Sequence, residues 1–199
     1  MMVIGLTGGI ATGKSTVSEI IREYNIPIID ADSIARDIVA PGNITLKKIG
    51  LEFGSEVINL DGNLNRKILG NIVFNDNQKL LKLNSITHPE IKKIVIKEIK
   101  RFRSMEKKAC IIDAPLLIEG GFVELVDYII LVYAPVLIVI DRLRSRDKVS
   151  EGEAVSRITK QMPFEEKKKF ADFIIDNSKN IEYTRNQLSN ILKKLYILP

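Results

Sequence analysis

The sequence is poor in cysteine, histidine and tryptophan: it contains only Cys110, only His88 and no tryptophan at all. With one cysteine no intramolecular disulfide can form, which excludes a disulfide-stabilised secreted scaffold and favours a reducing, cytoplasmic compartment. A chain of 199 residues buries enough surface to fold without a metal or a disulfide, as one domain or as one domain with an insertion. Cys110 lies in an apolar run, so we expect it to be buried and unreactive.

Long hydrophobic runs are also missing. The longest nearly unbroken run, Tyr128 to Ile140, is shorter than the ~20 residues that a membrane-spanning helix needs, and Pro135 interrupts it. The first nine residues, MMVIGLTGG, have no basic segment ahead of their apolar stretch, so they predict a first strand rather than a signal peptide. We therefore expect no association with a membrane.

The charges are nearly balanced, with 30 basic residues against 25 acidic ones and a formal net charge of +5. A modest positive excess fits a partner that carries phosphates. The sequence has no basic tail, no RNA-binding aromatic motif and no zinc-finger spacing, which favours a small anionic ligand over nucleic acid.

Short apolar runs alternate with longer amphipathic segments, a pattern typical of α/β proteins. The runs are continuous rather than alternating, as expected for strands buried on both faces of a parallel sheet. Between 44 and 103 the strand signal largely vanishes and apolar residues recur at helical spacing, which predicts a mostly helical insertion. Strands are predicted over 2–6, 26–29, 108–113, 127–133 and 172–175, and helices over 14–24, 33–40, 136–146 and 181–195.

Residues 8–15, GGIATGKS, match the phosphate-binding loop G-x-x-x-x-G-K-[ST] between a predicted strand and a predicted helix. Gly8 and Gly13 permit backbone angles and close approaches that a Cβ would prevent. The loop amides and the positive end of the helix then form a nest for phosphate oxygens. Lys14 can reach the β- and γ-phosphates, and the Ser15 hydroxyl can ligate Mg²⁺. The motif predicts binding of a nucleoside triphosphate with magnesium.

The sequence lacks the guanine-reading Asn-Lys-x-Asp segment of a GTPase. Several side chains instead favour a kinase. Asp30 and Asp32 follow the second predicted strand, at the edge of the sheet where α/β proteins bind ligands. They can hold a metal-bound water or accept a proton from an attacking hydroxyl, or they can cap the next helix. Arg142 and Arg146 share a helix face, where they can neutralise a transferring phosphoryl group or form a solvated helix end.

Taken together, these motifs and several further blocks resemble the dephospho-coenzyme A kinases, in order and over nearly the whole chain. In that family the loop usually reads Gly-Ile-Gly-x-Gly-Lys, so Ala11 replaces the middle glycine, and we expect Ala11 to fit with a negative φ. Of three arginines in the segment 141–147, the position of the preceding strand favours Arg142 as the catalytic one. The further blocks are Asp30-Ala31-Asp32 with Arg36, Pro41-Gly42, Asp61-Gly62 with Arg66, His88-Pro89-x-Ile91, Pro115-Leu116-Leu117-Ile118-Glu119 and Ala171-Asp172-x-x-Ile175-Asp176-Asn177-Ser178.

The resemblance implies the α/β fold of the P-loop nucleotide kinases, a five-stranded parallel sheet flanked by helices. One such domain would have a core over about 1–43, 104–141 and 171–199, a helical acceptor-binding insertion over 44–103 and a small lid over 142–170. It implies transfer of the ATP γ-phosphate to the ribose 3′-hydroxyl of dephospho-coenzyme A, the final step of coenzyme A synthesis. The alternatives are a kinase of another small acceptor, such as a nucleoside monophosphate, and a non-catalytic ATP-binding regulatory protein.

The resemblance also assigns roles to individual residues. Asp32 is the expected base, Lys14 and Arg142 are the other expected catalytic residues, and Ser15 and Asp32, the latter through a water, are expected to hold Mg²⁺. The substrates would be ATP and dephospho-coenzyme A, with no nucleic-acid partner, and the chain would be a monomer or a weak homo-oligomer. ATP is expected to contact Gly8, Gly9, Ile10, Ala11, Thr12, Gly13, Lys14, Ser15, Thr16, Arg142, Arg146 and Asn177. The acceptor is expected to contact Thr7, Asp32, Arg36, Arg66, His88, Pro115 and Leu116.

Three other features have mainly structural interpretations. His88 precedes Pro89, so we expect it to start a helix or to pack in the acceptor pocket rather than to act as a base. Asp113 ends a strand, where it is either a magnesium partner or held by backbone amides. The run from Lys167 to Lys169 predicts a solvated, charged surface.

Overall fold

The computed structural model describes residues 1–74 and 76–199, and the chain divides into two compact units. One unit contains 1–29 and 99–199, and the other contains 30–98. We describe each unit by itself.

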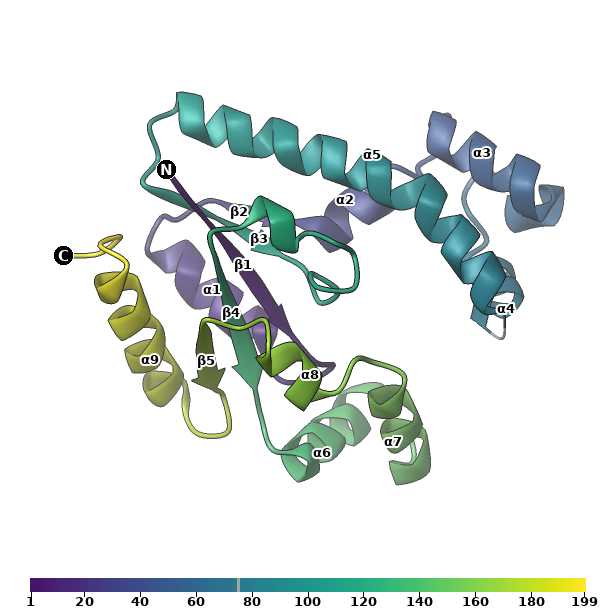
Figure 1. Cartoon of the computed structure of the whole chain (residues 1–199). Helices are drawn as coiled ribbons and strands as arrows, with labels where there is room; N and C mark the ends of the chain where they lie inside the picture. The colour runs from purple at the N-terminus through teal and green to yellow at the C-terminus, as the bar shows by residue number, and fades with distance from the viewer. Residues whose placement is uncertain (75) are drawn as a thin grey trace. The chain divides into compact units, whose positions relative to one another are not determined.

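The first unit is built on a five-stranded sheet in the order β2-β3-β1-β4-β5 (Figure 1). β1 pairs in parallel with both β3 and β4, and β4 pairs in parallel with β5, which confirms the predicted parallel sheet. The strands are β1 (Met2–Gly8), β2 (Ile28–Asp30), β3 (Ala109–Asp113), β4 (Tyr128–Tyr133) and β5 (Phe173–Asp176). The helices of this unit are α1 (Lys14–Glu23), α6 (Val136–Asp147), α7 (Glu151–Thr159), α8 (Phe164–Lys168) and α9 (Ile181–Lys194), with a 3-10 turn η2 (Val123–Leu125).

The central strand β1 uses its two faces differently. Ile4 and Leu6 are fully buried against α1 and α9, which pack on one face of the sheet (Figure 1). The alternate residues point to the other face, where Gly5 lies against Leu117 and the Thr7 hydroxyl donates to the Pro115 carbonyl over 3.0 Å. The strand therefore joins the main core to the loop that follows β3.

Two aspartates fix the start of β4 and β5. Asp127 N–H donates to the carbonyl of Val3 over 2.7 Å, and its carboxylate accepts from the N–H of Val3 over 2.7 Å. Asp172 makes the same pair of bonds with Ile129, over 3.0 and 2.8 Å. Each carboxylate takes the place of a further backbone acceptor, so the register of the parallel strands is held where they begin.

The second unit is helical, as the spacing of apolar residues predicts. Asn43 caps α3 by accepting from the N–H of Thr45, and Gly62 adopts φ 81° in the predicted turn. Its elements are α2 (Ala31–Asp37), α3 (Ile44–Phe53), a 3-10 turn η1 (Ser55–Val57), α4 (Arg66–Phe74) and most of α5 (Asn77–Ser104). In the described part of the chain, no helix is both long enough and apolar enough to span a bilayer.

The prediction that His88 starts a helix is wrong. His88 and Pro89 lie inside α5, eleven or more residues from its first residue, Asn77. A proline within a helix loses one hydrogen bond, here to the carbonyl of Ser85, and strains the turn before it. The helix continues because Ile91 and Val95, two and six residues beyond Pro89, are buried and hold this stretch in place.

The packing of Gly5 gives a first testable prediction. A Cβ at Gly5 would lie 2.7 Å from Leu117 Cδ1, and Leu117 is fully buried with no room to retreat. Gly5→Ala should therefore lower the free energy of unfolding by about 1–3 kcal/mol, measured by urea denaturation. Shortening Leu117 to alanine in the Gly5→Ala background should cost less than Leu117→Ala alone.

The matched control is Gly70→Ala in α4, where an added Cβ meets no atom within 4 Å. This change should raise stability by roughly 0.5–1 kcal/mol, because alanine is the better helix former. Wild-type stability for Gly5→Ala would contradict the close packing of β1 against Leu117.

Candidate phosphate-binding site

The phosphate loop leaves β1 at Gly8 and enters α1 at Lys14, and its two terminal glycines are required by the geometry. Gly13 has φ 91°, and a Cβ there would lie 1.8 Å from Asn177 Nδ2. At Gly8 a Cβ would lie 2.7 Å from Thr12 Oγ1 and 2.9 Å from the Val132 carbonyl. The sequence-based expectation for Gly8 and Gly13 is confirmed.

The expectation for Ala11 is wrong. Ala11 has φ 56°, in the left-handed region, rather than the negative φ that would suit alanine. The loop must reverse direction between β1 and α1 in a few residues, and this reversal imposes the left-handed angle whatever side chain is present. The cost to an alanine is roughly 1–2 kcal/mol.

The carbonyl groups of the loop are bound from outside by two side chains. Arg142 Nη1 donates to the carbonyls of Ala11 and Thr12 over 3.4 and 3.2 Å, and Arg142 Nη2 donates to the Asn177 carbonyl over 2.8 Å. Asn177 Nδ2 donates to the same Thr12 carbonyl over 2.8 Å, while its Oδ1 accepts from the hydroxyl of Thr184 over 2.8 Å. Of the first-turn amides of α1, that of Thr16 donates to the Gly13 carbonyl over 3.1 Å, which leaves those of Lys14 and Ser15 for a ligand.

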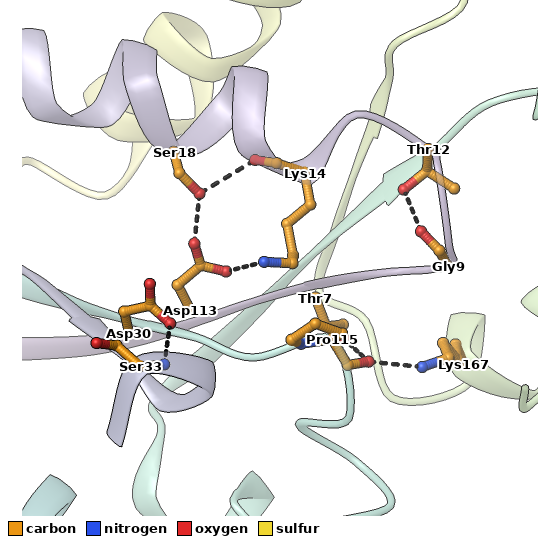
Figure 2. Close-up of polar contacts among 10 residues, drawn as sticks. All are labelled: Thr7, Gly9, Thr12, Lys14, Ser18, Asp30, Ser33, Asp113, Pro115 and Lys167. Atoms are coloured by element: carbon orange, nitrogen blue, oxygen red, sulfur yellow. Dashed lines mark hydrogen bonds and ion pairs between the residues drawn. The ribbon is translucent and has the colours of Figure 1, made fainter. Parts of the chain in front are cut away.

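Lys14 is paired with an acidic residue at the end of β3. Its ammonium group forms an ion pair and hydrogen bond with Asp113 Oδ1, and Ser18 Oγ lies 2.6 Å from Asp113 Oδ2 (Figure 2). Asp113 is buried, with 6% of its surface exposed. Both carboxylate oxygens therefore bind side chains, so the interpretation that backbone amides hold Asp113 is wrong.

A cleft of about 850 Å³ opens over the loop. Four cationic side chains line it, and among the described residues of its wall there is no carboxylate. Of the residues expected to contact ATP, all line the cleft except Thr12, which is buried and donates its hydroxyl to the Gly9 carbonyl over 2.9 Å. A wall of this charge suits a polyanion. The lining residues are Gly8, Gly9, Ile10, Ala11, Gly13, Lys14, Ser15, Thr16, Pro115, Arg142, Ser145, Arg146, Gln161, Asn177, Lys179 and Ile181.

The arginines of α6 differ in their surroundings. Arg142 is half-buried on the loop, whereas Arg146 is exposed and donates to both carboxylate oxygens of Asp147, over 2.7 and 3.1 Å. Asp147 also accepts from Arg157 of α7 over 2.6 Å, and the hydrogen bonds from Arg146 lower the pKa of Asp147. Arg144 points elsewhere, 4.0 Å from Glu151. Arg142 and Arg146 both line the cleft, as their spacing predicts.

The remaining expected residues of the first unit lie around the loop after β3. Pro115 lines the cleft, and Leu116 is half exposed, at 51%. Thr7 is fully buried and supports the Pro115 carbonyl with its hydroxyl, so any effect of Thr7 on a ligand passes through Pro115.

In the second unit, Asp30 and Asp32 have different roles. The Asp30 carboxylate accepts from the N–H of Ser33 over 2.9 Å and caps α2 (Figure 2). The capping interpretation is thus confirmed for Asp30, while Asp32 lies exposed in the first turn of α2.

Three further residues expected to bind the acceptor belong to the same unit. Arg36 is exposed in the last turn of α2, and Arg66 is exposed as the first residue of α4. His88 is half-buried in α5, and burial together with the nearby Lys92 charge lowers the pKa of His88, so its ring is neutral at pH 7. Cys110 is buried in β3 as expected, and burial raises the pKa of its thiol to about 11.

Lys167 and Gln161 make contacts that the sequence does not predict. Lys167 is not solvated: it is 1% exposed, and its ammonium group donates to the Pro115 carbonyl over 3.0 Å and lies 2.8 Å from Glu119 Oε1. Its partners lie about fifty residues earlier, and a run of three lysines gives no local signal that one of them turns inward. Gln161 Oε1 accepts from the N–H of Ile10 over 2.7 Å, which no sequence motif indicates.

The sheet order, the phosphate loop after the central strand and the cation-lined cleft define a P-loop kinase of small molecules. The family described as dephospho-CoA kinase matches residues 2–183, and the chain belongs to that family. A dephospho-CoA kinase from Carboxydothermus hydrogenoformans is 50% identical over 192 residues, which cover 96% of this chain and 93% of that protein.

Solved structures agree with this assignment. A protein from Thermus thermophilus has a TM-score of 0.84 and 30% identity, covering 98% of this chain and 97% of its own. The dephospho-CoA kinase from Campylobacter jejuni has a TM-score of 0.72 and 32% identity, covering 97% of this chain and 96% of its own.

The loop geometry gives a second prediction, from two substitutions with opposite expectations. Gly13→Ala combines a left-handed φ with a Cβ 1.8 Å from Asn177 Nδ2, so the loop must deform and ATP affinity should fall at least tenfold. Ala11→Gly removes a strain of roughly 1 kcal/mol but frees the unfolded chain, so stability should change little. Calorimetric ATP binding and thermal unfolding measure both. A Gly13→Ala variant with wild-type affinity would contradict this geometry.

Proposed function

We propose that the protein transfers the γ-phosphoryl group of ATP to the ribose 3′-hydroxyl of dephospho-coenzyme A, giving coenzyme A and ADP. The observation that carries the proposal is the cleft over the phosphate loop, lined by four cations, in a member of the dephospho-CoA kinase family. The bond between the acceptor oxygen and the γ-phosphorus forms as the bond from that phosphorus to the β,γ-bridging oxygen breaks. This reaction is the last step of coenzyme A synthesis.

The nucleotide phosphates would be held by the loop amides and by Lys14, Arg142 and Arg146. Lys14 starts from an ion pair with Asp113, and a triphosphate offers it a second, more highly charged partner. The exposed Ser15 hydroxyl in the first turn of α1 fits Mg²⁺, which takes one or two protein oxygens and fills its other positions with water and phosphate. Mg²⁺ would neutralise the β- and γ-phosphates, held by Ser15 and by Asp32 through a water.

Asp32 is the proposed base that takes the proton of the attacking hydroxyl. It lies two residues beyond the carboxyl end of β2, and the capping role at this helix start is filled by Asp30. The residues proposed to bind the acceptor are Arg36, Arg66, His88, Pro115 and Leu116. The positive charges of the two arginines suit the phosphates of such an acceptor.

Further parts of the proposal concern the setting of the reaction. The segment 142–170 acts as a lid that excludes water while the phosphoryl group is transferred. The segment 44–103 binds the acceptor. The enzyme works in the cytoplasm on small molecules without nucleic acid, as a monomer or a weak homo-oligomer.

A third prediction tests the reaction itself. With Mg-ATP and a panel of acceptors, ADP should form with dephospho-coenzyme A, and Lys14→Ala should lower that turnover by orders of magnitude in a folded protein. Turnover with a nucleoside monophosphate instead would indicate a different kinase. Tight ATP binding without transfer to any acceptor would indicate a regulatory protein.

A fourth prediction separates the two aspartates. Asp32→Asn keeps the shape of the side chain and removes the base, so kcat should fall about 10²–10⁴-fold with little change in ATP affinity. Asp30→Asn retains an oxygen that can cap α2, so its main effect should be a small loss of thermal stability. Steady-state kinetics and thermal unfolding of both variants make the comparison. Loss of turnover only in Asp30→Asn would reverse the assignment.

A further inference from the structure

Gln161, between α7 and α8, contacts the phosphate loop. Its Oε1 accepts from the N–H of Ile10 over 2.7 Å, and a Cβ built at Gly9 would lie 3.6 Å from the same oxygen. The side chain lines both the phosphate cleft and an adjoining, mainly apolar cavity of about 490 Å³. Gln161 therefore lies in the wall that the phosphate cleft and the apolar cavity share, beside the start of the loop.

The segment that carries Gln161 contacts the sheet and the loop after β3 in this structure. The ring of Phe164 packs on Tyr133, with centroids 4.4 Å apart. Lys167 donates to the Pro115 carbonyl, which also accepts from Thr7, as Figure 2 shows. A buried ammonium group is costly unless it is paired, so Lys167 strongly favours the arrangement in which Pro115 and Glu119 surround it.

The bond to Ile10 also determines how the carboxamide of Gln161 is turned. A backbone N–H must meet the oxygen, because the carboxamide nitrogen has no lone pair to offer. The oxygen thus binds the loop. The NH2 group on the same carboxamide carbon, with its two N–H bonds, is directed away from Ile10. Of the two spaces that Gln161 lines, only the phosphate cleft would hold a charged acceptor for these donors, a phosphate oxygen.

We infer that Gln161 is a positioning residue for phosphoryl transfer and that Lys167 holds it in place. In the ATP complex the oxygen keeps the Ile10 amide fixed, and the N–H groups steady the phosphate chain in the geometry of transfer. The inference rests on the proposed function. Small displacements of reacting groups cost large factors in rate, so the role should affect kcat more than ATP binding.

Two substitutions of Gln161 separate the role of its acceptor oxygen from that of its N–H donors. Gln161→Ala removes acceptor and donors, so kcat should fall about ten- to a hundredfold, with the KM for ATP changed less than threefold. Gln161→Glu keeps an oxygen for Ile10 but replaces the donors by negative charge, so kcat should fall as far and the KM for ATP should rise severalfold. The amide proton shift of Ile10, followed by NMR with a non-hydrolysable ATP analogue, should stay as in the wild type for Gln161→Glu and move upfield for Gln161→Ala.

A double-mutant cycle tests the part played by Lys167. Lys167→Met should lower kcat several-fold, and in the Gln161→Ala background it should lower kcat no further, because its effect passes through Gln161. Lys168→Met removes the same charge from the next, exposed residue and is the matched control, with kcat unchanged. Independent, multiplying effects of Lys167→Met and Gln161→Ala would overturn the link between the two residues.

Other outcomes decide the inference about Gln161 itself. Wild-type kinetics in Gln161→Glu would reduce Gln161 to a structural partner of Ile10, and wild-type kinetics in Gln161→Ala would remove any role. If the wild-type Ile10 amide loses its downfield shift when the ATP analogue binds, the bond does not persist and the inference is wrong. A wild-type protein that binds ATP but leaves dephospho-coenzyme A unphosphorylated would contradict the proposed function, while the NMR and ATP-affinity measurements would still decide the inference.

Discussion

The phosphate loop can point amides at a ligand only if its carbonyls turn the other way, and those carbonyls then need donors. The Ala11 and Thr12 carbonyls find them in Arg142 of α6 and in Asn177 directly after β5. These two residues are also joined to each other through the Asn177 carbonyl. Two residues more than a hundred positions further along the chain therefore supply the hydrogen-bond donors that these loop carbonyls need. The left-handed angles at Ala11 and Gly13 persist because this second layer holds them.

The same arrangement sets the charge of the cleft. Four cationic residues line the cleft, whereas Asp113, the acidic partner of Lys14, is buried, bound to Ser18 and absent from that lining. A polyanion therefore meets positive charge without a competing carboxylate at the described surface of the cleft. Lys14 is compensated by Asp113 in this structure, and the proposed triphosphate would give it a second anionic partner.

The features that could be predicted from the sequence, the sheet and the phosphate loop, follow from local chemistry. Buried strands are continuous apolar runs, and the glycines of the loop follow from the turn between β1 and α1, so the sheet and the loop were both expected. Contacts between distant segments have no such signature. Lys167 looks like its two neighbours in the run of lysines, yet it alone among them is buried, because the Pro115 carbonyl and Glu119 lie opposite it. The continuation of α5 through Pro89 could not be predicted for a related reason. The packing of residues beyond the proline outweighs the backbone hydrogen bond that the proline cannot make.

The described lining of the phosphate cleft comes entirely from the first unit, through its loop, the turn after β3, α6, the segment around Gln161 and the residues after β5. The other unit, 30–98, contributes none of those residues. The contacts proposed for the nucleotide therefore belong to the sheet and its own connections. Of the residues proposed for the acceptor, Arg36, Arg66 and His88 belong to the other unit, and Pro115 and Leu116 belong to the first. On the proposed roles, substitutions within 30–98 would alter acceptor binding while the loop, its carbonyl donors and its cations stay as they are.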